Sequence, residues 1–222
     1  MLSNGFVAIM ALAARTSLAA PLDPRAAANS AATLNAASIT SIDPSTSSCA
    51  GAPAAGECRT AAQAAPYISL SFTNFDIPSF GAQAALLSLV LYETGGLKYS
   101  RNHYPAPGRP GKGTRNMQMP EYNLRYANWL ASTCTNCEIT SAQVKQAEGE
   151  GVDSVLELVN TDQWSFSSAA WFLDTQCDAS VKERLARGDE AGWEAYLTAC
   201  VGTTATEDRT TIWRKAIAMG HW

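Results

Sequence analysis

Residues 79–96 read "SFGAQAALLSLVLYETGG", and this stretch predicts the central helix of the fold. Ser79 can cap the N-terminus of a helix, and the residues that follow are apolar on nearly every side. A helix that is apolar all round is buried in a protein core. Gly95 and Gly96 favour the left-handed conformation that ends a helix. We therefore expect a buried helix whose last turn carries one acidic residue, Glu93.

The rest of the chain past Cys49 is also predicted to be mostly helical. Thr140, Asp162 and Thr206 are residue types that begin helices. Further helices are expected over residues 61–75, 122–131, 141–148, 152–160, 167–176, 180–187, 190–200 and 208–219. No run of alternating residues indicates a sheet, although the 97–118 loop has room for a small β-hairpin. The expected fold class is all-α.

Three regions are expected along the chain. Residues 1–19 resemble a secretory signal peptide, because their apolar stretch is too short to span a bilayer and ends in a small-x-small cleavage pattern. Residues 20–47 have few large apolar side chains and are interpreted as a low-complexity leader or pro-segment. All six tryptophans and all seven tyrosines follow Cys49, so one compact domain is expected over 48–222. The expected location is extracellular.

The six cysteines indicate disulfide bonds, since an even count in an exported chain is typical of a disulfide framework. Sequence alone does not fix the connectivity. We expect local pairing, with the bonds Cys49–Cys58, Cys134–Cys137 and Cys177–Cys200. The C-x-x-C spacing of the second pair is also compatible with a redox site.

Composition argues against several classes of function. The formal net charge is −4, which gives no general attraction to nucleic acid. The chain has two histidines and lacks an HExxH motif and paired CxxC motifs, so no metal site is expected. It has no glycine-rich nucleotide-binding motif, and no cofactor is expected. We expect a monomer that binds neither nucleic acid nor membranes.

Glu93 is the first candidate catalytic residue. Burial and the negative end of the helix dipole both disfavour its charged form. A carboxylic acid that keeps its proton near neutral pH can protonate the oxygen of a glycosidic bond as that bond breaks. The alternative is an ordinary solvated glutamate, which is the more common state of this residue type.

The segment "GTRNMQMP" at residues 113–120 adds a second signal. Together with the preceding acid, it resembles the G-x-x-G-L-M-Q-I-M-P signature of the lysozyme-like superfamily, and most closely goose-type lysozymes and bacterial soluble lytic transglycosylases. Thr94 stands where that family usually has Ser after the catalytic Glu. Arg115 stands at the usual second Gly, and Asn116 at the usual Leu. From Cys49 onward the chain also resembles a group of secreted fungal lysozyme-like proteins.

The resemblance implies roles for individual residues. Glu93 would be the general acid, and Asn116, Met117 and Gln118 would line the floor of a cleft and hold a sugar. The family's Tyr-Asn-x-Gly element is absent, and at a comparable place Trp171 or Phe172 could stack on a sugar face. For both Met117 and Trp171 the alternative is a core position, and a core position is favoured for Phe172.

No second acid is convincing from sequence. Asp76, Glu121 and Asp174 are candidates for a base or nucleophile. An inverting glycosidase needs such a group roughly 6.5–9.5 Å from the acid. In the resemblance, lytic transglycosylases work with one Glu and use groups of the substrate itself, so hydrolase and transglycosylase both stay open.

The loop after Glu93 is cationic. Its basic residues are Lys98, Arg101, His103, Arg109, Lys112 and Arg115. A cationic rim would attract the carboxylates of muramyl peptides, whereas the alternative is a solvated charged loop.

The function implied by the resemblance is that of a secreted muramidase. It would cleave the β-1,4 bond between N-acetylmuramic acid and N-acetylglucosamine in peptidoglycan. The alternatives are a lytic transglycosylase, a chitin-active enzyme of the same fold, or a non-catalytic wall-binding or effector protein.

Overall fold

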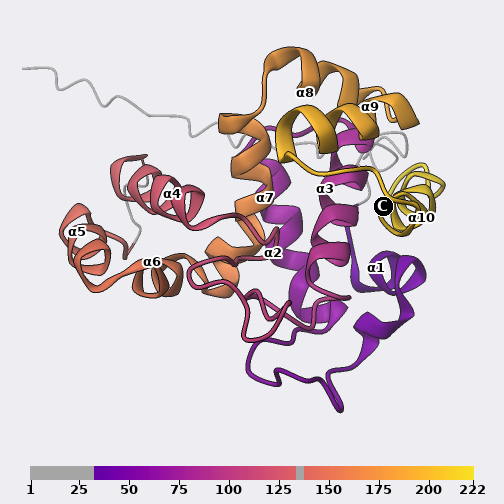
Figure 1. Ribbon diagram of the computed structural model, residues 1–222. Helices are drawn as coiled ribbons and strands as arrows, with labels where there is room; N and C mark the ends of the chain where they lie inside the picture. The colour runs from indigo at the N-terminus through magenta and orange to yellow at the C-terminus, as the bar shows by residue number, and fades with distance from the viewer. Residues whose placement is uncertain (1–32, 134–137) are drawn as a thin grey trace, which may run out of the picture. The chain divides into compact units, whose positions relative to one another are not determined.

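The computed structural model describes residues 33–133 and 138–222, and these residues are mostly helical with no strand among them (Figure 1). The helices are α1 (Ala36–Ile42), η2 (Pro44–Ser47), α2 (Ala61–Asn74), α3 (Phe80–Glu93), α4 (Pro120–Thr133), α5 (Ser141–Glu150), α6 (Val152–Val159), α7 (Asp162–Gln176), α8 (Ala179–Ala186), α9 (Glu190–Ala195), the π-helical segment η3 (Tyr196–Val201) and α10 (Glu207–Ile217). The expectation of an all-α, disulfide-bonded fold is confirmed. In place of a β-hairpin, the 97–118 loop contains only isolated antiparallel bridges.

Helix α3 lies at the centre of the helical unit, with α7 and α10 packed on it and α2 packed on α7 (Figure 1). Every residue from Ala84 to Leu91 is buried, as the sequence predicts for a helix that is apolar all round. The Ser79 hydroxyl accepts a hydrogen bond from the N–H of Ala82 and caps the helix. Gly95 and Gly96 have φ values of 58° and 71°, so the expected left-handed stop is present.

Helices α4, α5 and α6 pack on one another as a second group. Thr140 caps α5 as expected and forms a reciprocal capping box with Gln143. The group contacts the core through Tyr126 of α4, whose ring centroid lies 4.8 Å from that of Trp171 on α7. The start of α4 is therefore held at a fixed place beside α7, where both helices border the pocket described below.

Within the described residues, the compact unit already includes the chain from Thr33, well before the expected start near Ser48. Leu34, Ile39 and Ile42 are buried in the core, and the carbonyl of Leu34 accepts a hydrogen bond from the Ser69 hydroxyl on α2. The interpretation of residues 20–47 as a low-complexity leader or pro-segment does not hold for residues 33–47, which form α1 and η2 and pack in the core. Few large apolar side chains suffice here because α2 and α10 provide the surface that buries them. The predicted signal peptide, residues 1–19, lies outside the described residues.

Two of the expected helices differ from the structure by more than two residues. Helix α7 begins at Asp162, five residues before the predicted start at residue 167. Its first turns contain Ser165 and Ser168, polar residues that obscure the apolar pattern but are buried and hydrogen-bonded. The predicted helix over 190–200 is divided into α9 and the π-helical η3.

The disulfides Cys49–Cys58 and Cys177–Cys200 form as expected, with Cα–Cα distances of 5.9 Å and 5.2 Å. The predicted pair Cys134–Cys137 lies outside the described residues. The first bond closes the loop before α2, and the second joins the end of α7 to η3. In the described part of the chain, no helix has both the length and the apolarity that a membrane span requires.

Candidate active site

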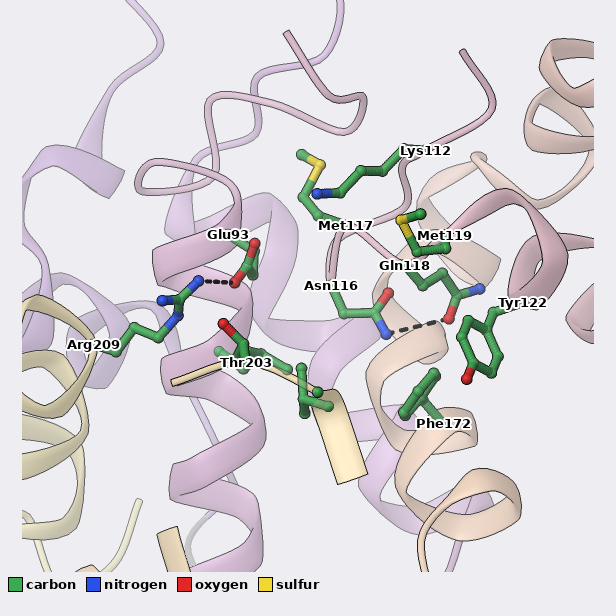
Figure 2. A pocket seen from close by; sticks show the side chains of 13 residues that line it. Glu93, Lys112, Asn116, Met117, Gln118, Met119, Tyr122, Phe172, Thr203 and Arg209 are labelled. Carbon is green, nitrogen blue, oxygen red and sulfur yellow. Dashed lines mark hydrogen bonds and ion pairs between the residues drawn. The ribbon is translucent and has the colours of Figure 1, made fainter. Parts of the chain in front are cut away.

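A pocket of about 230 Å³ lies where α3 ends (Figure 2). It is lined by Leu89 and Glu93 of α3, Lys112 and residues 116–119 of the following loop, Tyr122 of α4, Phe172 of α7, residues 201–203 at the end of η3 and directly after it, and Arg209 of α10. The pocket thus brings together the acid and the motif segment that the sequence singled out. It also adds residues from the C-terminal fifth of the chain that carried no motif.

The side chain of Glu93 lies at the pocket because Glu93 is the last residue of α3 and the helix ends directly after it. The hydroxyl of Thr94 donates to the carbonyl of Val90 at 2.6 Å and accepts from the N–H of Leu97 at 2.8 Å. Gly96 lies against η2 and its cap, where an added Cβ would come within 2.4 Å of the Ser45 hydroxyl. The turn after Glu93 is therefore fixed by a buried hydroxyl and by a glycine, and the carboxyl group stays at the pocket wall.

Arg209 is the residue at this site that sequence reasoning missed. Its Nη2 lies 3.1 Å from Oε1 of Glu93, and the two side chains are 15% and 17% exposed (Figure 2). Its guanidinium also lies 4.3 Å from the ring centroid of Tyr92. No motif marks Arg209, because 116 residues separate it from Glu93 and only the packing of α10 on α3 joins them.

Tyr196, on η3, is fully buried. Burial raises the pKa of Tyr196, and the negative charge of Glu93 raises it further. Within the described residues the Tyr196 hydroxyl has no hydrogen-bond partner.

The floor of the pocket is a chain of buried amides. Nδ2 of Asn116 donates to Oε1 of Gln118 at 3.2 Å, and Nε2 of Gln118 donates to Oδ1 of Asn123 at 2.7 Å. Asn123 in turn donates to the carbonyl of Gly111 at 2.8 Å. Between the first two amides, Met117 has a positive φ of 49° and borders the pocket. The three residues predicted to form the floor are thus brought together, and the side-chain amides of Asn116 and Gln118 are engaged by each other and by other buried polar groups.

Arg115 does not contribute to a cationic rim, because its side chain is 2% exposed. Its guanidinium donates to the carbonyls of Tyr99 at 3.0 Å and Glu57 at 2.7 Å, and it lies 4.6 Å from the ring centroid of Phe166. Burial lowers the pKa of Arg115 to about 10, while nearby Asp162 acts in the opposite direction. The lysozyme-like signature has Gly at this position, whereas Arg115 of this chain connects the loop to the core through these contacts.

The aromatic wall of the pocket consists of Tyr122 and Phe172, whose rings meet edge to face at a centroid distance of 4.8 Å. Trp171 is 1% exposed and packs in the core, outside the pocket lining. The prediction that Trp171 binds sugar is therefore wrong, and its neighbour on α7 takes the pocket position. Consecutive helical residues point about 100° apart, so only one of the two can face the pocket.

None of the three candidate second acids lies in this pocket, where Glu93 is the one acidic lining residue. Asp76 follows α2 and borders other cavities. Asp174 is half exposed and lies 3.5 Å from the amino group of Lys182. Glu121 is exposed in the first turn of α4. A second acid supplied by these residues is not supported by their positions.

The predicted cationic loop is mostly occupied by other contacts. Arg101 pairs with Glu157, and Nε2 of His103 lies 2.8 Å from Oε1 of Glu57. The amino group of Lys98 donates to the carbonyls of Ser45 and Ser48. Of the six basic residues in the loop, Lys112 is the one that lines the pocket. Together with Arg209 and Glu93 it gives the pocket lining a net charge of about +1 by simple counting of ionised side chains.

The fold and the pocket define an all-α, disulfide-bonded protein with one acid in this pocket. No protein-family model matches the chain, and no solved structure matches it. The chain is 40% identical over 141 residues to the bifunctional dioxygenase (DOX)-epoxy alcohol synthase (EAS) of Fusarium oxysporum (strain Fo5176). The match covers 64% of this chain and 11% of that protein, so the chain spans about a tenth of the relative's length. Among the described residues, no cluster of three or more His, Cys, Asp or Glu is placed to hold a metal ion.

Proposed function

We propose that this protein is a secreted glycosidase of lysozyme type, which cleaves the β-1,4 bond between N-acetylmuramic acid and N-acetylglucosamine. The observation that carries the proposal is the position of Glu93. It is the lone acid of a pocket whose floor is the Asn116–Gln118 segment of the lysozyme-like resemblance. The aromatic edge of Tyr122 and Phe172 on the opposite wall suits the apolar face of a sugar.

In this mechanism Glu93 donates a proton to the glycosidic oxygen, and the bond from that oxygen to the anomeric carbon breaks. Positive charge then develops on the sugar ring. With one acid in the pocket, the substrate's own N-acetyl group is the partner that stabilises this charge. Attack by water completes hydrolysis, whereas attack by the 6-hydroxyl of the same sugar gives the anhydro product of a transglycosylase; in either case the attacking hydroxyl gives its proton to the Glu93 carboxylate, which restores the acid. Lys112 favours a substrate that carries carboxylates, as peptidoglycan does.

A second candidate function is a non-catalytic protein that binds cell-wall glycans. Two observations favour it. The Glu93 carboxyl group is engaged by Arg209. An ion pair of this kind stabilises the charged carboxylate, whereas a general acid must carry a proton. The floor amides of Asn116 and Gln118 also bond to other protein groups, which leaves them fewer free donors for a sugar.

The deciding experiment compares wild type with Glu93→Gln on purified peptidoglycan, by loss of turbidity and by mass spectrometry of the products. The glutamine variant should fold and lose at least about 100-fold in rate, because general acid catalysis contributes roughly 10²–10⁴-fold. Glu121→Gln is the matched control, since Glu121 is exposed and outside the pocket. Released fragments that differ by one water separate hydrolase from transglycosylase.

Each outcome has a clear reading. Full activity in Glu93→Gln contradicts the assignment of the acid. A wild type that sediments with peptidoglycan but releases no fragments supports the non-catalytic candidate. Faster turnover of neutral chitin oligomers than of peptidoglycan makes the protein a chitin-active enzyme with the same acid.

We also propose that the protein acts outside the cell. The two disulfides are compatible with an oxidising compartment. Mass spectrometry of the protein collected from culture medium tests this proposal and identifies the mature N-terminus.

A further inference from the structure

The contact between Arg209 and Glu93 is more constrained than an ordinary surface ion pair. Both side chains are mostly buried, at 15% and 17% exposure, so solvent screens their interaction less than it screens an exposed pair. The two residues come from the first turn of α10 and the last turn of α3, which pack along each other.

The guanidinium of Arg209 makes two further contacts, while its buried Nε has no hydrogen-bond partner among the described residues. It lies over the ring of Tyr92 at 4.3 Å, and Nη1 is 3.5 Å from the carbonyl oxygen of Thr204. Because Tyr92 and Glu93 are consecutive, one guanidinium contacts both residues at the end of α3. This arrangement restricts the rotation of the Arg209 side chain and engages one oxygen of the carboxyl group, Oε1. Among the hydrogen bonds of the described residues, none involves Oε2 of Glu93, which leaves that oxygen available to a ligand in the pocket.

We propose that Arg209 is the positioning residue for Glu93: it holds one carboxyl oxygen so that the other faces the bond to be cleaved. This inference rests on the proposed function for its catalytic consequence. As the proton leaves Glu93, negative charge develops on the carboxyl group, and the guanidinium stabilises that charge. Interactions that become stronger in the transition state than in the ground state raise kcat.

A purely structural role for Arg209 makes a different prediction. In that case, replacing the residue would lower stability, and the remaining folded protein would turn over normally. A positioning role predicts a fall in kcat for fully folded protein, with a smaller change in KM. Lys112, the other basic residue of the pocket lining, and the buried Tyr196 stay in place in both cases.

The kinetic experiment measures kcat and KM of Arg209→Ala, Arg209→Gln and Arg209→Lys on soluble peptidoglycan strands, each at its own optimum pH. The alanine and glutamine variants should lose roughly 10- to 100-fold in kcat, since small displacements of a catalytic group can cost about that much. The lysine variant should recover part of the loss. Millimolar guanidinium should restore activity to Arg209→Ala by occupying the vacated site.

Arg214→Ala is the matched control. Arg214 lies on the same helix and also forms ion pairs, with Glu190 and Glu207, but it is exposed and outside the pocket. Its replacement should leave kcat unchanged and gain nothing from guanidinium. If Arg209→Ala keeps its full kcat, or if guanidinium affects both variants equally, the positioning role is wrong.

A second measurement needs no enzymatic activity. Urea unfolding of Glu93→Gln, Arg209→Gln and the double variant forms a double-mutant cycle. The two substitutions should be non-additive, by about fivefold or more in the unfolding equilibrium constant. Additive effects overturn the inference whether or not the protein is a glycosidase. Clear coupling in a wild type that cleaves no glycan would reject the proposed function and leave Arg209 as the residue that holds Glu93.

Discussion

The hydroxyl of Ser168 on α7 lies 2.9 Å from Oδ1 of Asn116, and this contact joins the centre of the helical unit to the floor of the pocket. The Thr114 hydroxyl lies 2.8 Å from the same oxygen. Asn116 then donates to Gln118, so one side chain contacts three polar partners. The floor is therefore held by buried hydrogen bonds, and its geometry depends on Asn116 being an amide.

Asn116→Leu restores the residue that the lysozyme-like resemblance has at this position, and it should destabilise this protein. Leucine leaves the hydroxyls of Thr114 and Ser168 and the amide of Gln118 with one partner fewer. We expect a loss of about 2–3 kcal/mol in the free energy of unfolding. Urea unfolding measures it, with Asn128→Leu on the exposed face of α4 as the control. A loss below about 0.5 kcal/mol would show that the floor repacks around an apolar side chain.

Removal of the disulfide Cys177–Cys200 should affect both stability and activity. The bond spans 23 residues, and a loop of this size corresponds to roughly 3 kcal/mol in the chain-entropy model. Cys200 is followed directly by residues 201–203 of the pocket wall, so a double Ser variant should also turn over more slowly when fully folded. The same change at Cys49 and Cys58, which lie outside the pocket, is the control for stability alone. Equal activity in both folded variants would contradict a role in shaping the wall.

Tyr196→Phe should stabilise the protein at neutral pH. The Tyr196 hydroxyl is buried without a partner among the described residues, and an unpaired buried polar group costs about 1–3 kcal/mol. Phenylalanine keeps the ring and its packing. Urea unfolding at pH 7 should give an increase of about 1 kcal/mol in the free energy of unfolding. A decrease of that size would show that the hydroxyl is hydrogen-bonded in solution.

The same variant gives a pH-dependent prediction. Burial raises the pKa of Tyr196 in the folded protein above the unfolded value near 10. Above about pH 10 the unfolded chain therefore loses this proton while the folded chain keeps it, and stability falls by roughly 1.4 kcal/mol per pH unit. Tyr196→Phe lacks this loss, so its advantage over wild type should grow between pH 9 and 11. Tyr126 and Arg115 are present in both proteins, and their contributions cancel in the difference.

Lys112→Gln should weaken activity on peptidoglycan chiefly at low ionic strength. Its amino group is the loop cation that lines the pocket, and such an attraction is screened over about 8 Å at physiological salt. The loss should shrink as salt is added, and turnover of a neutral chitin oligomer should fall much less. Arg101→Gln is the control because Arg101 already pairs with Glu157. Equal losses on charged and neutral substrates at every salt concentration would mean that Lys112 shapes the pocket and does not attract the substrate.

The sequence by itself determined the features that depend on neighbours along the chain. The cap at Ser79, the apolar run of α3 and the glycine stop act within a few residues of each other, so their pattern predicts the helix and places Glu93 at its end. The disulfides Cys49–Cys58 and Cys177–Cys200 confirm the local pairing that we expected, although the sequence alone did not fix their connectivity. The motif segment lines the same pocket, although residues 94–112 separate it from the end of α3.

Only the tertiary structure decided the rest of the site. Helix α7 has buried residues on most of its faces, so its sequence does not indicate whether Trp171 or Phe172 faces the pocket. The rotation of α7 about its own axis, set by packing against α3, decides which of the two does. From the sequence, Arg115 is a charged residue in a loop. In the folded protein its guanidinium is buried because it donates hydrogen bonds to the carbonyls of Tyr99 and Glu57, which are distant along the chain. Arg209 contacts Glu93 although 116 residues separate them in the sequence. The contact forms because α10 packs on α3, and that packing depends on all the contacts between the two helices and not on a local sequence pattern.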